Sequence, residues 1–184
     1  MSKCYLLFAE GLEECEGLIT LDILRRAGLE TYTVSVQDAH TVVGAHGVPI
    51  TCDRTLPELL AAPPELVVLP GGMPGTTNLA KSPAVETLVR RTLEHGGRVA
   101  AICAAPTALA AFGVLNGKKA TVYPGMDADL TAAGASYTGL PLTIDGSIVT
   151  GEALGAAIPF ALALARILAG ADAANRVKSA IVYQ

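Results

Sequence analysis

Short apolar runs typical of buried strands alternate along this chain with segments of helical periodicity. Strands buried on both faces and separated by helices favour a mostly parallel sheet that is covered on each side. The pattern predicts buried strands at 3–9, 66–69 and 99–102, and helices at 15–27, 83–94, 105–112 and 155–168. We therefore predict an α/β sandwich formed by a single domain over residues 1–184.

Several weaker patterns add to this sheet. Residues 30–36 alternate apolar and polar side chains, which predicts a further strand. Residues 42–43 and 48–51 are joined by a glycine-containing turn and predict a small hairpin outside the main sheet. Additional short strands are predicted near Thr121, near Ile144 and at 148–150.

The composition excludes several classes of protein. Hydrophobic residues make up 51% and charged residues 16% of the chain, which argues against disorder, and the net charge of −4 argues against nucleic acid as a main partner. The charge-free stretch 153–165 is shorter than the roughly 18 to 20 apolar residues that span a bilayer. The run 4–9 is too short for a signal-peptide core. We expect a cytoplasmic protein with no membrane partner.

The four cysteines and three histidines limit the available metal and thiol chemistry. They form no C-x-x-C or H-x-x-x-H spacing, so we do not expect a metal site. Thiols in a reducing compartment need not be bridged. Cys4 and Cys52 lie in or beside predicted strands and are interpreted as structural, and Cys15 lies in the first predicted helix. Cys103 is the candidate for a reactive thiol.

Three loops leave predicted strands at one edge of the sheet. They are the acidic loop 10–16, the glycine-rich loop 70–77 and the turn 103–106. Open α/β sheets bind ligands at the carboxyl ends of their strands. The convergence of these loops predicts the functional site.

Cys103 stands at an abrupt transition from a predicted strand to a predicted helix. This is the layout of a nucleophile elbow, where a tight turn exposes the side chain beside backbone N–H groups. The following helix N-terminus would favour the nucleophilic thiolate. The alternative is a small buried core residue, a common role of free cysteine. Position alone leaves both interpretations open.

The acidic loop contains carboxyl groups with different expected roles. Glu13 and Glu14 are interpreted as solvated residues at a helix start, where they suit the macrodipole. Glu16 would point inward, and a carboxyl buried beside a thiol has a raised pKa and can relay protons. His46, in the predicted hairpin turn, is expected to be exposed without a function. The glycine-rich loop lacks a nucleotide-binding motif and by itself indicates a plain turn.

Three motifs in this order resemble a known family. They are Glu-Glu-x-Glu at 13–16, Leu-Pro-Gly-Gly at 69–72 and Ala-Ile-Cys-Ala-Ala-Pro-Thr at 101–107. Together they closely resemble the ThiJ/PfpI superfamily, in the branch of the Parkinson-disease-associated protein deglycase and its bacterial relatives. The likeness runs through nearly the whole chain. It implies a flavodoxin-like three-layer sandwich and a homodimer.

The resemblance also implies roles for individual residues. Cys103 would be the nucleophile, Glu16 would hydrogen-bond its sulfur, and the N–H groups of Gly72 and Ala104 would form an oxyanion site. The remaining pocket residues would be Gly71, Pro106 and Tyr123.

The chain departs from the family pattern at three places. Tyr123 stands where relatives often carry a histidine, so Glu16 would have to do more of the proton transfer, because tyrosine is a poor base near neutral pH. Residues 150–153 lack the arginine of the Ser-Arg-Gly-Pro segment, so its anion-binding or dimer-contact role does not carry over. Ala104 replaces the histidine of protease-like relatives, so a peptidase is not expected.

The function implied is that of a cofactor-independent, glyoxalase III-like enzyme. It would convert small 2-oxoaldehydes such as methylglyoxal and glyoxal to 2-hydroxy acids, with protein or nucleotide deglycation as a further activity of the same thiol. An alternative is a redox-sensing or chaperone-like oxidative-stress protein, in which Cys103 oxidises to a sulfinate stabilised by Glu16. A third is a degenerate site. The same residues serve these interpretations, so the sequence leaves them open.

Overall fold

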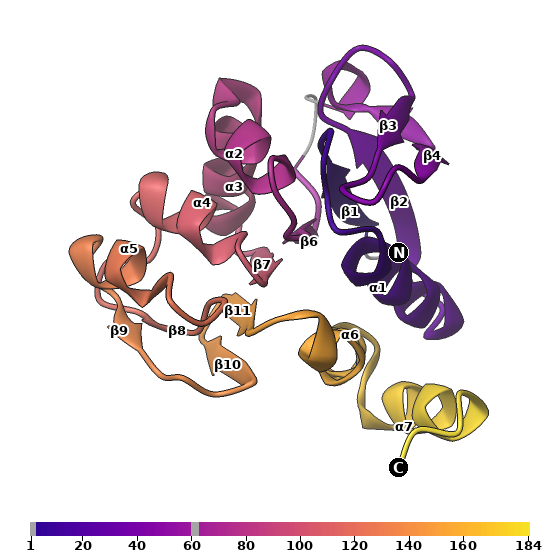
Figure 1. Cartoon of the computed structure of the whole chain (residues 1–184). Helices are drawn as coiled ribbons and strands as arrows, with labels where there is room; N and C mark the ends of the chain where they lie inside the picture. The colour runs from indigo at the N-terminus through magenta and orange to yellow at the C-terminus, as the bar shows by residue number, and fades with distance from the viewer. Residues whose placement is uncertain (1–2, 60–62) are drawn as a thin grey trace.

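A seven-stranded sheet forms the centre of the computed structural model, which describes residues 3–59 and 63–184 (Figure 1). Its strands are β1 (Lys3–Phe8), β2 (Glu30–Ser35), β5 (Arg54–Thr55), β6 (Leu66–Leu69), β7 (Arg98–Ile102), β10 (Leu142–Asp145) and β11 (Ile148–Gly151). Their order is β10-β11-β7-β6-β1-β2-β5, and all neighbours are parallel except the antiparallel pair β10–β11. The predicted mostly parallel sheet is confirmed.

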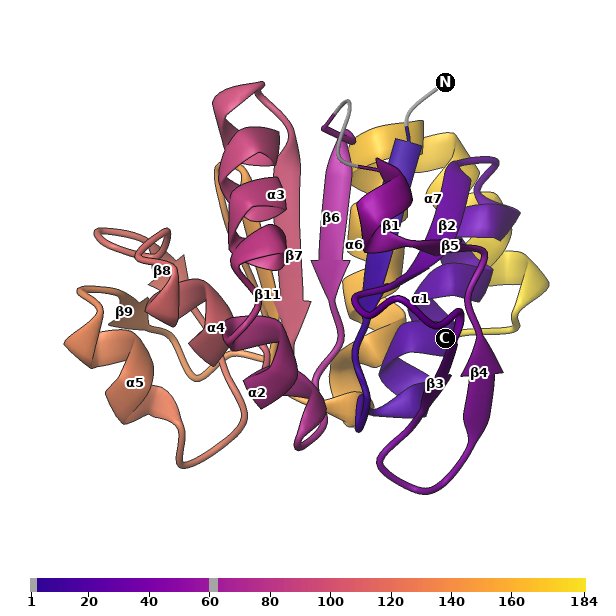
Figure 2. The same cartoon turned by 90° about the horizontal axis from the view of Figure 1, so that it is seen from above.

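Helices cover both faces of this sheet (Figures 1 and 2). One face carries α1 (Glu14–Arg26), α6 (Ala157–Ala169) and α7 (Ala171–Ala180), and the other carries α2 (Gly75–Ala80), α3 (Pro83–Glu94) and α4 (Pro106–Ala111). The predicted three-layer sandwich is therefore confirmed.

Within the described ranges, no helix combines the length and apolarity that crossing a bilayer requires.

The central strand β1 shows why its sequence is almost continuously apolar. Tyr5 and Leu7 belong to the core on the α3 side, whereas Leu6 and Phe8 belong to the core on the α1 side. Alternate side chains of a strand point to opposite faces, so a strand covered on both faces buries both sets, and in β1 every residue after Lys3 is buried. Full burial of each large side chain stabilises the fold by about 1.5–3 kcal/mol.

The direction of the chain connections changes between β1 and β6. From β1 the chain passes through α1 to β2 on one side, and from β6 it passes to β7 on the other side. Ligands bind at such switch points in open α/β sheets, outside the carboxyl ends of the strands. The segments that follow β1, β6 and β7 therefore meet at one edge.

The four predicted helices are confirmed to within two residues at each end. The last of them begins later than predicted, because η2 (Leu154–Ala156) forms a 3-10 turn before α6. The predicted hairpin is confirmed as an antiparallel pair outside the main sheet, formed by β3 (Thr41–Val43) and β4 (Pro49–Thr51).

The residue pattern did not predict several short elements. Three of them are the helices α2, α7 and α5 (Asp127–Ala132), which have no side-chain N-cap. The strands β5 and β9 (Ser136–Tyr137) were also not predicted, and β8 (Lys119–Ala120), the parallel partner of β9, lies close to the strand predicted near Thr121. The 3-10 turn η1 (Leu56–Leu59) was not predicted either. Short helices are marginal by themselves and depend on tertiary packing, which local sequence does not report.

Candidate active site

The three loops singled out in the sequence meet at the switch point. The backbone N–H of Gly71, after β6, donates to Oε2 of Glu16 in the first turn of α1 at 2.9 Å. A Cβ atom placed on Gly71 would lie 2.6 Å from Cβ of Cys103, which follows β7. The predicted convergence of these loops is confirmed.

Cys103 occupies a strained turn between β7 and α4. Its φ angle is +63°, a left-handed conformation that is costly for a residue with a side chain and is typical of functional sites. Its N–H donates to the carbonyl oxygen of Gly151 at 3.0 Å, and its own carbonyl accepts from the N–H of Tyr123 at 2.9 Å. These two bonds hold the elbow, and the thiol is half-buried.

Glu16 points inward, as predicted, and is 1% exposed. Burial raises the pKa of its carboxyl to about 7, against the opposing effect of hydrogen bonds from Gly71 and Cys103. Among the described residues, its second oxygen, Oε1, is buried without a hydrogen-bond partner. A carboxyl group with a pKa near 7 is present in both protonation states at neutral pH.

The Cys103 thiol does not have the lowered pKa expected from its place before a helix. Burial raises the pKa of Cys103 to about 12, and the charge of Glu16 and its hydrogen bond add to this increase. The N–H groups of Ala104 and Gly72 act in the opposite direction but do not outweigh desolvation. When Glu16 is protonated its negative charge is gone, so the thiolate forms most readily beside a neutral Glu16.

Gly72 and Ala104 bring two backbone N–H groups from different loops to the same sulfur atom. Gly72 has a φ angle of +88°, and a Cβ atom there would lie 2.2 Å from the backbone nitrogen of Glu13. Only glycine fits this position. Two converging donors beside a nucleophile are the arrangement that stabilises a developing oxyanion.

Two of the remaining predicted pocket residues, Tyr123 and Pro106, adjoin the elbow through the backbone. Tyr123 is bonded to the Cys103 backbone, and its side chain is 49% exposed. Pro106 is buried and begins α4.

The other three cysteines lie away from the elbow in the sequence. Cys4 and Cys52 are buried, with pKa values raised by burial to about 12 and about 11, as expected of structural thiols. Cys15 is exposed on α1.

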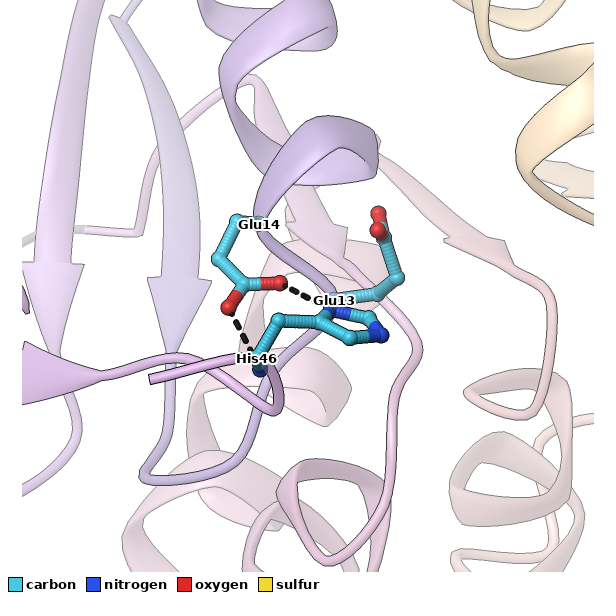
Figure 3. A group of neighbouring side chains, drawn as sticks. All are labelled: Glu13, Glu14 and His46. Atoms are coloured by element: carbon cyan, nitrogen blue, oxygen red, sulfur yellow. Dashed lines mark hydrogen bonds and ion pairs between the residues drawn. The ribbon is translucent and has the colours of Figure 1, made fainter. Parts of the chain in front are cut away.

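The prediction that Glu14 is a solvated helix-start residue is wrong. Glu14 is 4% exposed, and its two carboxylate oxygens bond the backbone N–H of His46 at 2.7 Å and Nδ1 of His46 at 2.8 Å (Figure 3). The turn between β3 and β4 covers the start of α1, and residues 32 positions apart in sequence carry no local signal of this contact. His46 itself is exposed, as expected.

Glu13 caps α1, because its Oε2 accepts the N–H of Glu16 at 2.7 Å. Glu13, Glu14 and His46 offer potential metal-ligand atoms within 4.8 Å of one another, and in residues 3–59 and 63–184 they are the one such group. Both Glu14 oxygens are already engaged by His46 and Glu13 is engaged in capping. The group is therefore a hydrogen-bonded cluster that ties the hairpin to the helix.

Comparison with known proteins identifies the family. Residues 2–167 match the model of the DJ-1/PfpI family. The chain belongs to the DJ-1/PfpI family. Protein dj-1beta of Drosophila melanogaster is 36% identical over 99% of this chain and 98% of its own. The fold is also similar to the crystal structure of Drosophila melanogaster DJ-1beta. The two structures align over 100% of each chain with a TM-score of 0.97 and 35% sequence identity.

Two other relatives of this DJ-1/PfpI protein have names that state an activity. The glutathione-independent glyoxalase DJR-1.2 of Caenorhabditis elegans is 30% identical over 95% of this chain and 92% of its own. Deglycase PH1704 of Pyrococcus horikoshii is 31% identical over 80% of this chain and 88% of its own. The family resemblance predicted from the three motifs is confirmed, together with the flavodoxin-like fold.

Proposed function

We propose that this DJ-1/PfpI protein is a glutathione-independent glyoxalase that converts small 2-oxoaldehydes to 2-hydroxy acids, with deglycation as a further activity of the same thiol. The observation that carries this proposal is the convergence on Cys103 of a buried carboxyl group and two backbone N–H donors. The names of the relatives DJR-1.2 and PH1704 support it.

The first step is addition of the thiol to the aldehyde. The Cys103 thiol proton passes to the Glu16 carboxylate, and the sulfur forms a bond to the aldehyde carbon. The carbonyl π electrons move to oxygen, where the N–H groups of Gly72 and Ala104 stabilise the negative charge. Return of the proton to this oxygen gives a neutral hemithioacetal.

The second stage is an internal oxidation and reduction. Glu16 removes the proton from the former aldehyde carbon and delivers it to the neighbouring ketone oxygen, which gives an enediol. The hydroxyl proton on the former aldehyde carbon then passes through Glu16 to the ketone carbon, which leaves a thioester of the 2-hydroxy acid on Cys103. Water then cleaves the C–S bond, which releases the acid and restores the thiol. The aldehyde carbon is oxidised and the ketone carbon is reduced, so no external oxidant is needed.

The pKa of Glu16 suits these proton transfers. General acid–base catalysis is most efficient when the pKa of the group lies near the working pH, and burial raises the pKa of Glu16 to about 7. Tyr123 donates its backbone N–H to the Cys103 carbonyl and has a half-exposed side chain, and we assign its hydroxyl to hydrogen-bonding the substrate ketone.

The test is production of lactate from methylglyoxal without added glutathione. We expect Cys103→Ser to lower kcat/KM by about 100-fold or more, because the nucleophile is lost. Cys15→Ser is the matched control, since Cys15 is exposed on α1, and should retain the wild-type rate. Wild-type activity no higher than that of Cys103→Ser would contradict the proposal.

We further propose that the protein acts as a homodimer. An apolar groove of about 310 Å³ on the face of α1 and α6 is lined by Leu18, Ile19, Asp22, Ile23, Ile158 and Ile181. Leu18 is 39% exposed there, and burial of such a surface against a second copy would remove apolar area from water.

A further inference from the structure

His46 takes no part in the proposed chemistry, yet it holds a buried carboxylate next to the site. Its backbone N–H and its ring Nδ1 each engage one oxygen of Glu14, at 2.7 and 2.8 Å (Figure 3). The Glu14 side chain is 6% exposed, so these bonds replace most of its contact with water. A buried carboxylate that lost such a partner would have to find another or move.

The turn between β3 and β4 is fitted closely to this carboxyl group. A Cβ atom on Gly44 would lie 2.2 Å from Cγ and 2.3 Å from Cδ of Glu14, so the turn backbone rests directly on the side chain. The N–H of Ala45 donates to the carbonyl of Leu12 at 2.8 Å. The hairpin therefore docks on the acidic loop through both side-chain and backbone contacts.

The acidic loop in turn sets the position of the turn after β6. The N–H of Glu13 donates to the carbonyl of Gly71 at 2.8 Å, and the N–H of Gly75 donates to the carbonyl of Gly11 at 3.0 Å. Gly72 packs against the backbone of Glu13 without room for a Cβ atom. A shift of the loop would therefore move the turn that carries the N–H donor of Gly72.

We propose that His46 is a positioning residue: its bonds to Glu14 hold the acidic loop so that Gly72 and Glu16 keep their places around Cys103. The kinetic part of this inference rests on the proposed function. The structural part does not, because it concerns only how firmly the acidic loop holds the turn at residues 70–76.

The charges around His46 make this contact dependent on pH. The charged groups that act on His46 are Glu14 and Glu13 at the start of α1. Glu10, in the acidic loop 10–16, accepts a hydrogen bond from the N–H of Val43 in the hairpin. The hydrogen bond to Glu14 and its charge raise the pKa of His46 above its usual value. A raised pKa means that the charged pair is fully formed at low pH and loses its charge as the pH rises through the folded-state pKa.

The experiment measures amide hydrogen exchange of residues 70–76 and steady-state kinetics with methylglyoxal in the full chain. We expect His46→Ala to speed exchange in that segment about tenfold, as for loss of a hydrogen bond to a charged group. It should also lower kcat about tenfold with KM within about twofold. His46→Asn keeps a donor near the Nδ1 position without a titrating charge, so it should restore most of the protection and remove the dependence of exchange on His46 ionisation.

His40→Ala is the matched control. His40 is also exposed and also bonds through Nδ1, but to the carbonyl of Cys52 at 3.0 Å at the other end of the hairpin. We expect this variant to leave exchange at 70–76 unchanged. Wild-type exchange in His46→Ala, or an equal increase in His40→Ala, would overturn the inference. Absence of glyoxalase activity from the wild type would overturn the proposed function alone, since the exchange comparison still decides the role of His46.

Discussion

Three carboxyl groups within four positions at the start of α1 have three different environments. Glu13 caps the helix, Glu14 is buried against His46, and Glu16 is buried beside Cys103. For Glu14, burial acts to raise the pKa, but hydrogen bonds from His46 and the backbone outweigh it and the pKa is lowered. Glu16 has the Gly71 N–H and the weakly donating Cys103 thiol as donors, and its Oε1 has no partner among the described residues, so desolvation dominates and its pKa is raised. The number of donors decides the charge state.

This difference predicts how stability depends on pH. The pKa of Glu16 rises from 4.5 in the unfolded chain to about 7 in the fold, so the native state holds the proton to higher pH. Ionisation of Glu16 therefore leaves the free energy of unfolding unchanged below about pH 4.5. As the pH rises to 7 it lowers the free energy of unfolding, by up to about 3 kcal/mol. Glu16→Gln keeps an acceptor for the Gly71 N–H and cannot ionise. We expect it to be more stable than the wild type by about 3 kcal/mol at pH 8 and to differ little near pH 4.5.

Urea denaturation at several pH values measures this effect. Glu94→Gln, at an exposed position near the end of α3, serves as the control and should give a curve parallel to the wild type. If the Glu16→Gln curve also ran parallel to the wild-type curve, the raised pKa of Glu16 would be contradicted.

At the scale of elements, the site depends on how closely the ends of β6 and β7 approach each other. A Cβ atom on Gly71 would lie 2.6 Å from Cβ of Cys103, 2.8 Å from Oε2 of Glu16 and 2.9 Å from the carbonyl oxygen of Ile102. The last of these is backbone, which cannot yield as a side chain can. Position 71 therefore requires glycine, because there is no room for a Cβ atom between the ends of the two strands.

Gly71→Ala is expected to displace the elbow. We expect kcat/KM to fall by about 100-fold, since a misplacement of about 1 Å has that effect, with a cost to stability of about 1–3 kcal/mol. Gly155→Ala is the matched control, because a Cβ atom there would meet nothing within 4 Å and its φ angle is not positive. Steady-state kinetics and thermal melting compare the two variants. Equal kinetics for Gly71→Ala and Gly155→Ala would refute the steric requirement.

At the scale of the whole molecule, the site edge and the groove on α1 and α6 are linked through α1. This helix carries the buried Glu16 in its first turn and, two residues later, the exposed Leu18. A dimer formed through this face would therefore hold the helix that carries Glu16, the carboxyl group proposed to act in catalysis.

Leu18→Asp tests that dimer. We expect the wild type to have twice the 18.8 kDa mass of the chain by light scattering, and Leu18→Asp to have the mass of one chain, because a charge would be buried without a partner. Leu140→Asp is the control, since Leu140 is 55% exposed just before the edge strand β10. Dissociation of both variants, or of neither, would argue against an interface centred on α1.

Much of the fold and part of the site could be predicted from local patterns. The continuous apolar runs indicated two-sided burial, and the strand–Cys–helix order at 99–112 indicated the elbow that the φ angle of Cys103 now shows. The short helices α2, α5 and α7 were not predictable, since each has no side-chain N-cap and depends on packing for its stability. The inward direction of Glu16 was predicted, while the burial of Glu14 was not.

The sequence by itself determined the alternation of buried strands and helices and the three motifs of the DJ-1/PfpI family, because these depend on residues close together in the chain. Only the tertiary structure decided the protonation balance between Cys103 and Glu16 and the contact of His46 with Glu14. The pKa of a buried group depends on how much water is removed and on which donors face it. Both are set by loops that meet only when the sheet has formed.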